Sequence, residues 1–349
     1  MNTEALQSAL LAHYDATRRA MPWRDTSDPY AIWVSEVMLQ QTRVETVIPY
    51  WERWMERFPT VGHLAEADVD DVLRHWQGLG YYSRARNLHK AARMVRERHD
   101  GRVPGDADGL RGLPGIGEYT AGAVASIAFG QPVPAVDGNV RRVLARVRDL
   151  SDPTPAGLRE AAGALVPDDR PGDFNQALME LGATLCTPRS PDCGVCPIAE
   201  WCRARALGVQ EERPRPGKRK PVPEEGVETV VLVRPDGALL LARRPEDGLL
   251  GGMWEFPGEL RADPVAALVA EADPGPVLEP LTHVFTHKRV TYHPVILHTP
   301  GDLPLAEDLA WVAPEGLSRY ALPVAQQEIA RRATRALAGR AARDLTSSA

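Results

Sequence analysis

The amino-acid sequence predicts a multidomain protein in which an all-α domain is followed by an α+β domain. The length of 349 residues exceeds what one ordinary core needs. Apolar residues repeat with a helical period before residue 208 and alternate after residue 225, and a proline-rich stretch separates the two patterns. Hydrophobic residues make up 44% and charged residues 25%, which excludes wholesale disorder and a fibrous repeat.

The first half contains segments in which apolar side chains recur every three and four positions, the period of an amphipathic helix. These segments are residues 33–58, 69–79, 86–98 and 120–129. Short breaks of Gly, Pro and Asp separate them. We therefore expect a helical domain over residues 1–207.

The second half has the period of strands. Residues 227–245 form two strand-like runs around Asp236 and Gly237, and residues 283–298 alternate in steps of two. Residues 208–225 contain four prolines and no apolar period, a composition typical of a stiff linker. We expect the strand-rich domain over residues 226–349.

The net charge of −6 argues at first against a nucleic-acid partner. Residues 1–220, however, hold 29 basic and 29 acidic side chains, whereas residues 221–349 hold 12 and 18. Arginines and one lysine cluster between Arg84 and Arg98, and four arginines lie between Arg141 and Arg148. Solvated helix faces remain an alternative, but two such clusters favour contacts with phosphates.

Nothing near the N-terminus resembles a secretory signal, because residues 1–20 are amphipathic and charged. No run approaches the roughly 18 apolar residues that a membrane span needs. We expect a cytoplasmic protein, associated with the nucleoid in a bacterial cell, with no membrane partner.

Four cysteines lie within one short segment, at Cys186, Cys193, Cys196 and Cys202. Zinc is the alternative metal for four clustered cysteines, but zinc sites normally pair two short Cys-x-x-Cys knuckles across a longer gap. A 4Fe–4S cluster accepts four thiolates from one compact loop, and the spacing favours it.

Residues 110–130 contain Gly115 and Gly117 in a tight turn that leads into a helix. An ordinary turn between helices is the alternative. Free amides at a helix start can bind a phosphate without recognising base sequence. The pattern is typical of a helix-hairpin-helix element.

Two carboxylates stand out. Asp137 begins a helix and could be an N-cap alone. Glu36 lies among apolar residues, where burial raises a carboxyl pKa and keeps a proton available near neutrality. A protonated Glu and an ionised Asp suit cleavage of a glycosidic bond, in which one protonates the leaving group and the other opposes the developing cation.

These motifs in this order resemble the helix-hairpin-helix DNA glycosylases that carry an iron–sulfur cluster. Residues 21–54 and 76–92 and the C-terminal half resemble the MutY family of adenine glycosylases in particular, so the likeness covers nearly the whole chain. The resemblance implies a helix-hairpin-helix glycosylase domain with a 4Fe–4S loop, followed by an α+β Nudix-like domain. It further implies a monomer in base excision repair that removes adenine mispaired with 8-oxoguanine, or more weakly with guanine, in double-stranded DNA.

The resemblance also assigns roles to residues. It makes Glu36 the proton donor to adenine and Asp137 the carboxylate that stabilises the sugar cation, with Tyr119 and Asn139 beside them. Other positions are expected to contact DNA or the flipped base, and core packing remains an alternative for the two aromatic ones among them: Gln41, Tyr81, Gly115, Gly117, Trp23, Arg24, Gln176 and Glu180.

Position 119 separates this sequence from endonuclease III, whose lysine there forms a Schiff base. Because the phenol of Tyr119 cannot form an imine, the sequence predicts a monofunctional glycosylase with little or no lyase activity. A noncatalytic DNA-binding module is a further alternative.

The second domain resembles the Nudix-like domain of the same family. Residues 258–275 lack the paired glutamates that hold metal ions in Nudix pyrophosphatases, so that activity is not expected. Phe285, Thr286 and His287 match the family's Phe-Ser-His loop, which implies recognition of 8-oxoguanine, with threonine in place of serine. A surface histidine on a strand end is the alternative for His287.

Overall fold

The computed structural model describes residues 2–215, 217, 221–258, 265–300 and 307–347. The chain forms two compact units. The helical unit comprises Met1–Ala67 and Asn87–Lys218, and the sheet unit comprises Asp68–Arg86 and Arg219–Ala349. Parts of the expected linker (216 and 218–220) and of the segment without paired glutamates (259–264) lie outside the described residues.

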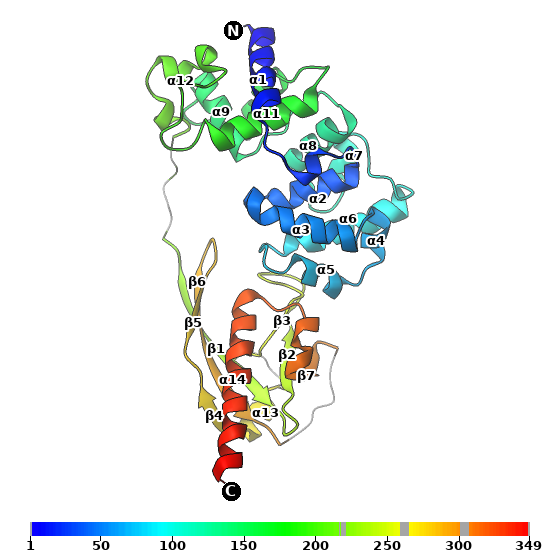
Figure 1. Cartoon of the computed structure of the whole chain (residues 1–349), viewed down its shortest axis with the longest axis vertical. Coiled ribbons are helices and arrows are strands. Elements are labelled where there is room, and N and C mark those ends of the chain that lie inside the picture. Colours follow the sequence, from blue (N-terminus) through cyan, green and yellow to red (C-terminus); the bar gives the residue numbers. More distant parts are fainter. Residues whose placement is uncertain (1, 216, 218–220, 259–264, 301–306, 348–349) are drawn as a thin grey trace. The chain divides into compact units, whose positions relative to one another are not determined.

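The helical unit is built of short helices, shown in blue to green in Figure 1. They are α1 (Thr3–Thr17), α2 (Pro29–Leu39), α3 (Val44–Arg57), α4 (Val61–Glu66), α6 (Ser83–Arg98, whose start belongs to the sheet unit), α7 (Ala107–Arg111), α8 (Glu118–Phe129), α9 (Gly138–Arg148), α10 (Pro155–Gly163), α11 (Pro171–Thr184) and α12 (Arg203–Ala206). Single 3-10 turns occur at Pro22–Arg24, Ala199–Trp201 and Gln210–Glu212.

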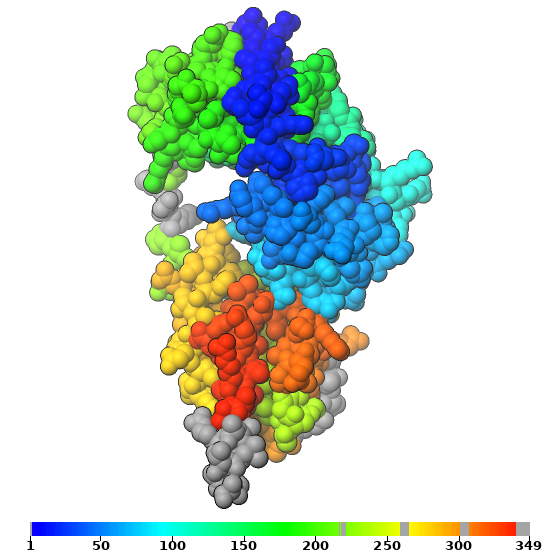
Figure 2. Space-filling view, in the orientation of Figure 1, coloured from blue at the N-terminus to red at the C-terminus, as the bar shows by residue number. Residues whose placement is uncertain are grey.

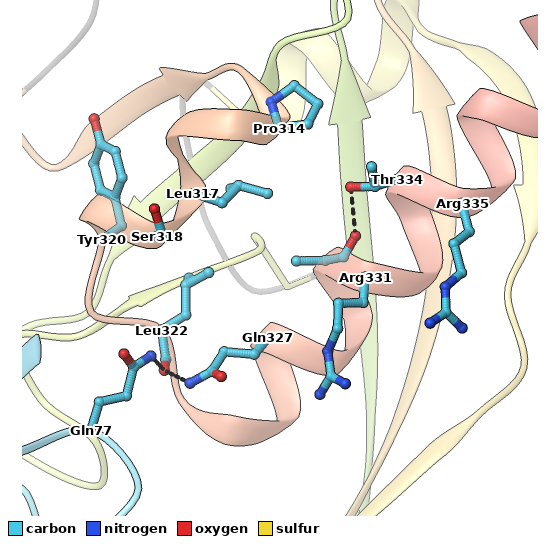
Figure 3. A pocket seen from close by; sticks show the side chains of 11 residues that line it. Gln77, Pro314, Leu317, Ser318, Tyr320, Leu322, Gln327, Arg331, Thr334 and Arg335 are labelled. Atoms are coloured by element: carbon cyan, nitrogen blue, oxygen red, sulfur yellow. Dashed lines mark hydrogen bonds between the residues drawn. The ribbon is translucent and has the colours of Figure 1, made fainter.

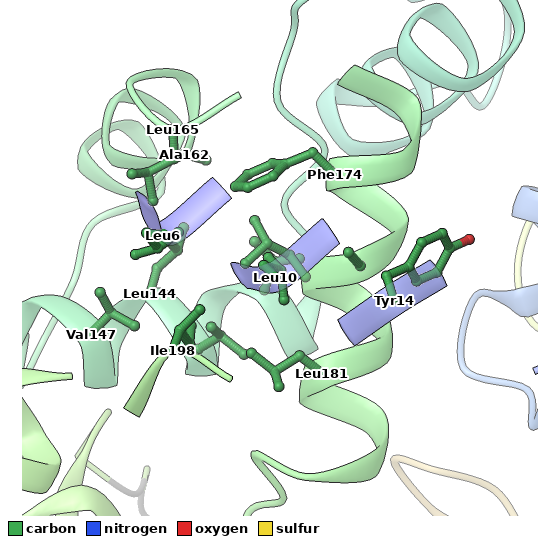
Figure 4. Close-up of a cluster of buried hydrophobic side chains, with 14 of the residues drawn as sticks. Leu6, Leu10, Tyr14, Leu144, Val147, Ala162, Leu165, Phe174, Leu181 and Ile198 are labelled. Atoms are coloured by element: carbon green, nitrogen blue, oxygen red, sulfur yellow. The ribbon is translucent and has the colours of Figure 1, made fainter. Parts of the chain in front are cut away.

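One apolar core joins helices that are far apart in the sequence. Leu6, Leu10 and Tyr14 of α1 recur every four residues and pack with side chains of α9, α10 and α11 (Figure 4). Figure 2 accordingly shows the blue surface of α1 beside the green surface of the later helices. This core forms the back of the cysteine loop, because Cys186 and Cys196 pack against it.

The segment 33–58, with its helical repeat of apolar residues, spans two helices. The structure ends α2 at Leu39 and begins α3 at Val44. Gln41 between them has φ of 58°, a left-handed conformation that no helix of L-residues continues. Every residue of α2 from Tyr30 to Met38 is buried, so α2 is a central helix rather than an amphipathic surface one.

The sheet unit contains one mixed sheet of seven strands. They are β1 (Glu224–Val233), β2 (Leu239–Arg243), β3 (Trp254–Glu255), β4 (Asp273–Val277), β5 (Leu281–Val284), β6 (Arg289–His298) and β7 (Leu309–Val312). The order is β3-β2-β1-β6-β4, with β5 beside β6 and β7 beside β2. Only the β1–β6 pair is parallel among the pairs described.

The alternation of β1 divides its side chains between two cores. Val231 and Val233 belong to the core on the side of α14 (Val324–Ser347), whereas Val230 and Leu232 belong to the core on the side of α13 (Val265–Glu271). The β1–β2 turn contains Gly237 with φ of 85°, at the predicted position. The sheet is therefore covered on both faces, and the α+β prediction is confirmed.

Helix α5 (Val69–Trp76) belongs to the sheet unit, where Asp70 pairs with Arg243 at 3.0 Å. A cavity of about 530 Å³ lies between the 3-10 turn Pro314–Arg319 and α14. Figure 3 shows Leu322 O accepting hydrogen bonds from Gln77 and Gln327 at its edge. No cysteine, histidine or carboxylate lines this cavity, so it lacks the side chains expected for acid–base catalysis or metal binding.

Candidate active site

A cavity of about 310 Å³ in the helical unit brings together most residues predicted for the site. Its wall comes from the Pro22–Arg24 turn, α2, the start of α3, the start of α8, the start of α9, and α11. The predicted residues that line it are Trp23, Arg24, Glu36, Tyr119, Asp137, Asn139, Gln176 and Glu180.

Glu36 lies on the central helix α2 and is 6% exposed. Burial, with a smaller contribution from the nearby Asp137, raises the pKa of Glu36 to a net value of about 7. A hydrogen bond from Tyr119 and the charge of Arg24 act in the opposite direction. The direction of this shift is the one that the sequence predicts for a carboxyl among apolar residues.

Tyr119 connects the start of α8 to Glu36. Its hydroxyl donates to Glu36 Oε2 at 2.5 Å and also contacts Met179 Sδ at 3.3 Å. Burial, together with the adjacent carboxylates, raises the pKa of Tyr119 well above its ordinary value. The phenol therefore stays neutral and serves as a hydrogen-bond donor.

Asp137 is the N-cap of α9 and at the same time lines the cavity. Its Oδ1 accepts from Val140 N at 2.7 Å, and its Oδ2 accepts from Asn139 Nδ2 at 2.9 Å. Burial raises the pKa of Asp137, whereas these hydrogen bonds and Arg142 favour the ionised form. Capping and chemistry are thus compatible at this position.

A charged network forms the far wall of the cavity. Arg24 donates to Glu180 Oε2 at 2.6 Å and to Gln176 Oε1 at 3.2 Å. Arg19 donates to Glu180 Oε1 at 2.9 Å. Burial opposes ionisation of Glu180, but the hydrogen bonds from both arginines outweigh it and lower its pKa. The wall therefore offers fixed polar groups to a ligand.

Trp23, which lines the same cavity, is 6% exposed and packs edge-on against Trp51.

Hydrogen bonds connect the site to the cysteine loop. Asn139 Oδ1 accepts from Arg142 Nη2 at 2.9 Å, and Arg142 Nε donates to Cys186 O at 2.7 Å. Helices α9 and α11 lie close together here. A Cβ on Gly182 of α11 would lie 2.6 Å from Asn139 Cβ, so this position needs glycine.

The cysteine loop fits the predicted cluster. All four cysteines are partly buried and form no disulfide. The guanidinium of Arg146 is 2% exposed, donates to Cys186 Sγ at 3.2 Å and bonds four backbone carbonyls of the region. Burial, with the neighbouring cysteines, raises the pKa of Cys196 to about 11, so a thiolate there needs compensating positive charge. Four sulfur donors backed by an arginine are suited to an iron–sulfur cluster.

The support for a cluster lies in the residue types and in Arg146, because no group of three or more His, Cys, Asp or Glu side chains within the described part of the chain, the four cysteines included, is arranged around a single metal ion.

The helix-hairpin-helix turn lies between α7 and α8. Gly115 has φ of 77°, and a Cβ there would lie 2.5 Å from Asn87 Cβ. Gly117 is the N-cap of α8, with no side chain bonded to the first amides. Gly115 is therefore required by the turn, whereas Gly117 has an extended backbone with space for a Cβ.

The two residues predicted to insert into the duplex share one backbone feature. Gln41 and Tyr81 have φ of 58° and 48°, and both side chains are exposed, that of Tyr81 by 41%. Left-handed conformations of bulky residues are strained and occur often at functional sites. They do not line the cavity around Glu36.

In the sheet unit, the turn between β5 and β6 carries Phe285, Thr286 and His287. Phe285 N donates to Lys288 O at 2.8 Å and closes this turn, while Thr286 and His287 are exposed. The hydroxyls of Thr286 and Tyr81 share a hydrogen bond, and all these residues except Lys288 line a cavity of about 300 Å³. Phe285 packs edge-on against His283 at 4.6 Å.

The expectation that both basic clusters contact phosphates is wrong for their buried members. Arg142 and Arg146 are committed to backbone carbonyls. Arg84 is 9% exposed and lies over the ring of Trp76. Arg19 and Met179 line the cavity, but the sequence analysis missed them. The spacing of Gln176, Met179, Glu180 and Ala183 on one face of α11 was the signal for the second of these.

Comparisons with known families agree with this arrangement. Residues 34–168 match the HhH-GPD superfamily of base excision DNA repair proteins. Residues 186–202 match the iron–sulfur binding domain of endonuclease III, and residues 229–332 match the NUDIX domain.

An adenine DNA glycosylase of Homo sapiens is 39% identical over 402 aligned positions, which cover 94% of this chain and 73% of that protein. The chain belongs to the adenine DNA glycosylase family. The adenine DNA glycosylase of Mycolicibacterium smegmatis is 48% identical over 203 residues, covering 57% of this chain and 69% of that protein. A solved thermostable thymine-DNA glycosylase is 30% identical with a TM-score of 0.55, covering 59% of this chain and 97% of its own.

Membership of the family confirms several predictions. The fold is a helix-hairpin-helix glycosylase domain followed by a Nudix-like domain, and the protein binds DNA. The cysteines carry a 4Fe–4S cluster rather than zinc. No helix in the described ranges has the length and apolar character to cross a membrane.

Proposed function

We propose that the protein removes adenine mispaired with 8-oxoguanine, and more weakly with guanine, by hydrolysing the bond between base and sugar. One observation carries this proposal: a buried carboxyl with a pKa of about 7, Glu36, shares a cavity with a second carboxylate, Asp137. Two carboxyl groups with different environments are what a glycosidic cleavage requires.

Glu36 donates its proton to N7 of adenine, which turns the base into a neutral leaving group, and it later assists the attacking water. Asp137 opposes the positive charge that develops on the sugar. Tyr119 orients Glu36 through its hydrogen bond, and Asn139 holds Asp137 through another. These two hydrogen bonds hold each carboxyl group in place before substrate arrives.

The polar wall around Glu180 recognises the base. Adenine presents an amino donor and ring-nitrogen acceptors, and Gln176 and Glu180 offer oxygen acceptors held in place by Arg24. Trp23 supplies an aromatic surface of the same cavity. The site is therefore complementary to a purine that has left the duplex.

The duplex is held and opened by other residues. The amides after Gly115 and Gly117 bind a backbone phosphate, and Gln41 and Tyr81 fill the space that the extruded adenine leaves. One chain supplies every group of the proposed site, so the protein can act as a monomer; we infer that it does so on the DNA of a bacterial nucleoid.

The proposed activity is tested with a duplex that contains adenine opposite 8-oxoguanine. We expect release of free adenine and an alkali-labile abasic site, with slower release opposite guanine. Absence of base release from protein whose absorption spectrum shows the iron–sulfur chromophore would sink the proposal.

Strand cleavage without alkali is expected to be negligible. Tyr119 lacks an amine, so no imine with the opened sugar forms at that position, and borohydride should trap little protein on DNA. The variant Tyr119→Lys supplies the amine at the same place and is the matched comparison. Strong trapping of the unaltered protein would contradict the assignment of a monofunctional glycosylase.

Thr286 is expected to provide part of the preference for 8-oxoguanine. We infer that its exposed hydroxyl hydrogen-bonds the lesion, with Phe285 and His287 shaping the same turn. Thr286→Val keeps the shape and removes the hydroxyl, and with it both the inferred bond to the lesion and the bond to Tyr81. The ratio of excision rates opposite 8-oxoguanine and guanine should fall by roughly 3- to 10-fold.

Thr282→Val is the matched control, because Thr282 is exposed on the same hairpin and bonds Thr291 instead. An unchanged ratio in Thr286→Val, or an equal fall in both variants, would remove Thr286 from lesion recognition.

A further inference from the structure

A second cavity lies against the other side of Asp137. Its volume is about 470 Å³, and it shares Asp137 and Tyr119 with the cavity that contains Glu36. Glu36 lines only the first cavity. Apart from the shared Asp137, the charged residues of the second cavity are Glu118, Arg141 and Arg159, and none of them lines the first. Asp137 and Tyr119 therefore form a wall common to two chambers.

Two arginines line this second cavity. Arg141 belongs to α9 and Arg159 to α10, and both are exposed. Among the residues that the structure describes, neither guanidinium has an ion pair or hydrogen bond, whereas Arg142 and Arg146 on the same helix as Arg141 are committed to backbone carbonyls. An unpaired guanidinium beside a cavity is available for a phosphate.

The backbone around the cavity favours an anion as well. The first residues of α8, α9 and α10, which are Glu118, Gly138 and Pro155, all line it. Helix starts carry partial positive charge. The carboxylate of Glu118 is paired with Arg111 at 3.4 Å, which offsets its charge.

We propose that this cavity binds the backbone phosphate next to the extruded adenosine, through Arg141 and Arg159. The proposal rests on the roles assigned above to Glu36 and Asp137. If Glu36 protonates the base and Asp137 faces the sugar, the base occupies the chamber that contains Glu36. The phosphate attached to that sugar then lies beyond Asp137, in the chamber that contains both arginines.

The assignment gives the two arginines a positioning role. The extruded nucleotide is bound by its base in the first cavity and by its phosphate in the second. Its sugar is thereby held next to Asp137. Phosphate contacts fix register without recognising sequence, so this site acts on any extruded nucleotide, and selection of adenine remains with the first cavity.

The test compares charged and neutral backbones. The full-length protein carries Glu36→Gln so that the duplex stays intact, and binding is measured with a single methylphosphonate on the 5′ or the 3′ side of the target adenosine. We expect one of the two neutral positions to weaken binding by roughly tenfold or more, the loss of charge-assisted hydrogen bonds. Adding Arg141→Gln and Arg159→Gln should abolish that sensitivity and reduce the salt dependence of binding by about one phosphate contact in total.

Arg102→Gln is the matched control, because Arg102 is an exposed arginine of the helical unit that lines neither cavity. It should keep the full sensitivity to the methylphosphonate. Equal sensitivity in the arginine double variant, or no sensitivity at either position in the parent, overturns the proposal. Since these measurements need no excision, failure of base release with Glu36 intact would separately reject the proposed function.

Discussion

Replacing Glu36 with glutamine is expected to slow adenine excision by about 10²- to 10⁴-fold, the usual contribution of a general acid-base group. Glutamine keeps the size of the side chain and accepts the hydrogen bond of Tyr119, but it has no proton to donate to the base. Single-turnover excision with the protein in excess over the duplex measures the effect. Duplex binding should survive, because Glu36 is buried and contacts no backbone phosphate in the proposed complex.

The pH dependence of excision follows from the same carboxyl. Since Glu36 must be protonated and its pKa is raised to about 7, excision by the unaltered protein should fall as the pH rises through that value. Asp137 must be ionised, and its raised pKa places an acidic limb above the ordinary range of aspartate. A rate that keeps rising above pH 8 would contradict the role of Glu36 as acid.

Removing the Glu36 carboxyl should stabilise the protein at high pH, although it slows excision. Glu36 titrates at about 4.5 when unfolded and at about 7 when folded, so the folded protein holds the proton more tightly. The cost of the buried charge is absent below pH 4.5 and is complete above pH 7. Glu36→Gln should therefore increase the free energy of unfolding at pH 8 by as much as about 3 kcal/mol and have little effect at pH 4.

The exposed Glu52 of α3 provides the matched control, because Glu52→Gln removes a carboxylate from the same unit without unburying or burying a charge and should not reproduce the gain in stability at pH 8. If Glu36→Gln leaves excision unchanged, the noncatalytic DNA-binding module becomes the better description of the helical domain.

The residues proposed for catalysis and cluster binding stand out in the sequence because their residue type or spacing is unusual for the segment that contains them. Glu36 stands out because a carboxyl in an apolar segment is costly, and the structure places it on the fully buried α2. The four cysteines stand out by spacing alone. The strand pair around Gly237 follows from alternation and turn residues, whereas the turn at Thr286, which divides the alternating run 283–298 into β5 and β6, was not predicted. These signals are local, so the sequence contains them.

Contacts that depend on packing between distant segments could not be predicted. Arg142 and Arg146 have the spacing of a basic surface. In the structure, however, both side chains of α9 face the cysteine loop and donate hydrogen bonds to backbone carbonyls within residues 182–188. Arg141, their neighbour, points to a cavity instead. Charge counts cannot separate a guanidinium that stabilises a loop from one that is free for DNA, because the two differ only in tertiary partners.

Asp137 has two explanations, and substitution can separate them. As N-cap of α9 it accepts the amide of Val140, and asparagine and serine cap helices about as well. As the carboxylate facing the sugar it contributes charge, which neither substitute carries. Asp137→Asn and Asp137→Ser should therefore keep the fold of the helical unit while excision falls by about 10²- to 10³-fold.

The two variants check each other. In Asp137→Asn an amide group faces Asn139 Nδ2, which now donates to Asp137 Oδ2 at 2.9 Å, so a local shift could lower the rate for geometric reasons. Serine is too short to meet Asn139 and avoids that conflict. Circular dichroism melting monitors the cap, and single-turnover excision monitors the charge. Full excision in either variant would leave Asp137 as a cap alone and would remove the electrostatic half of the proposed mechanism. Loss of excision in both, with unfolding temperatures within a few degrees of the parent, is the result that the buried pair of carboxyl groups requires.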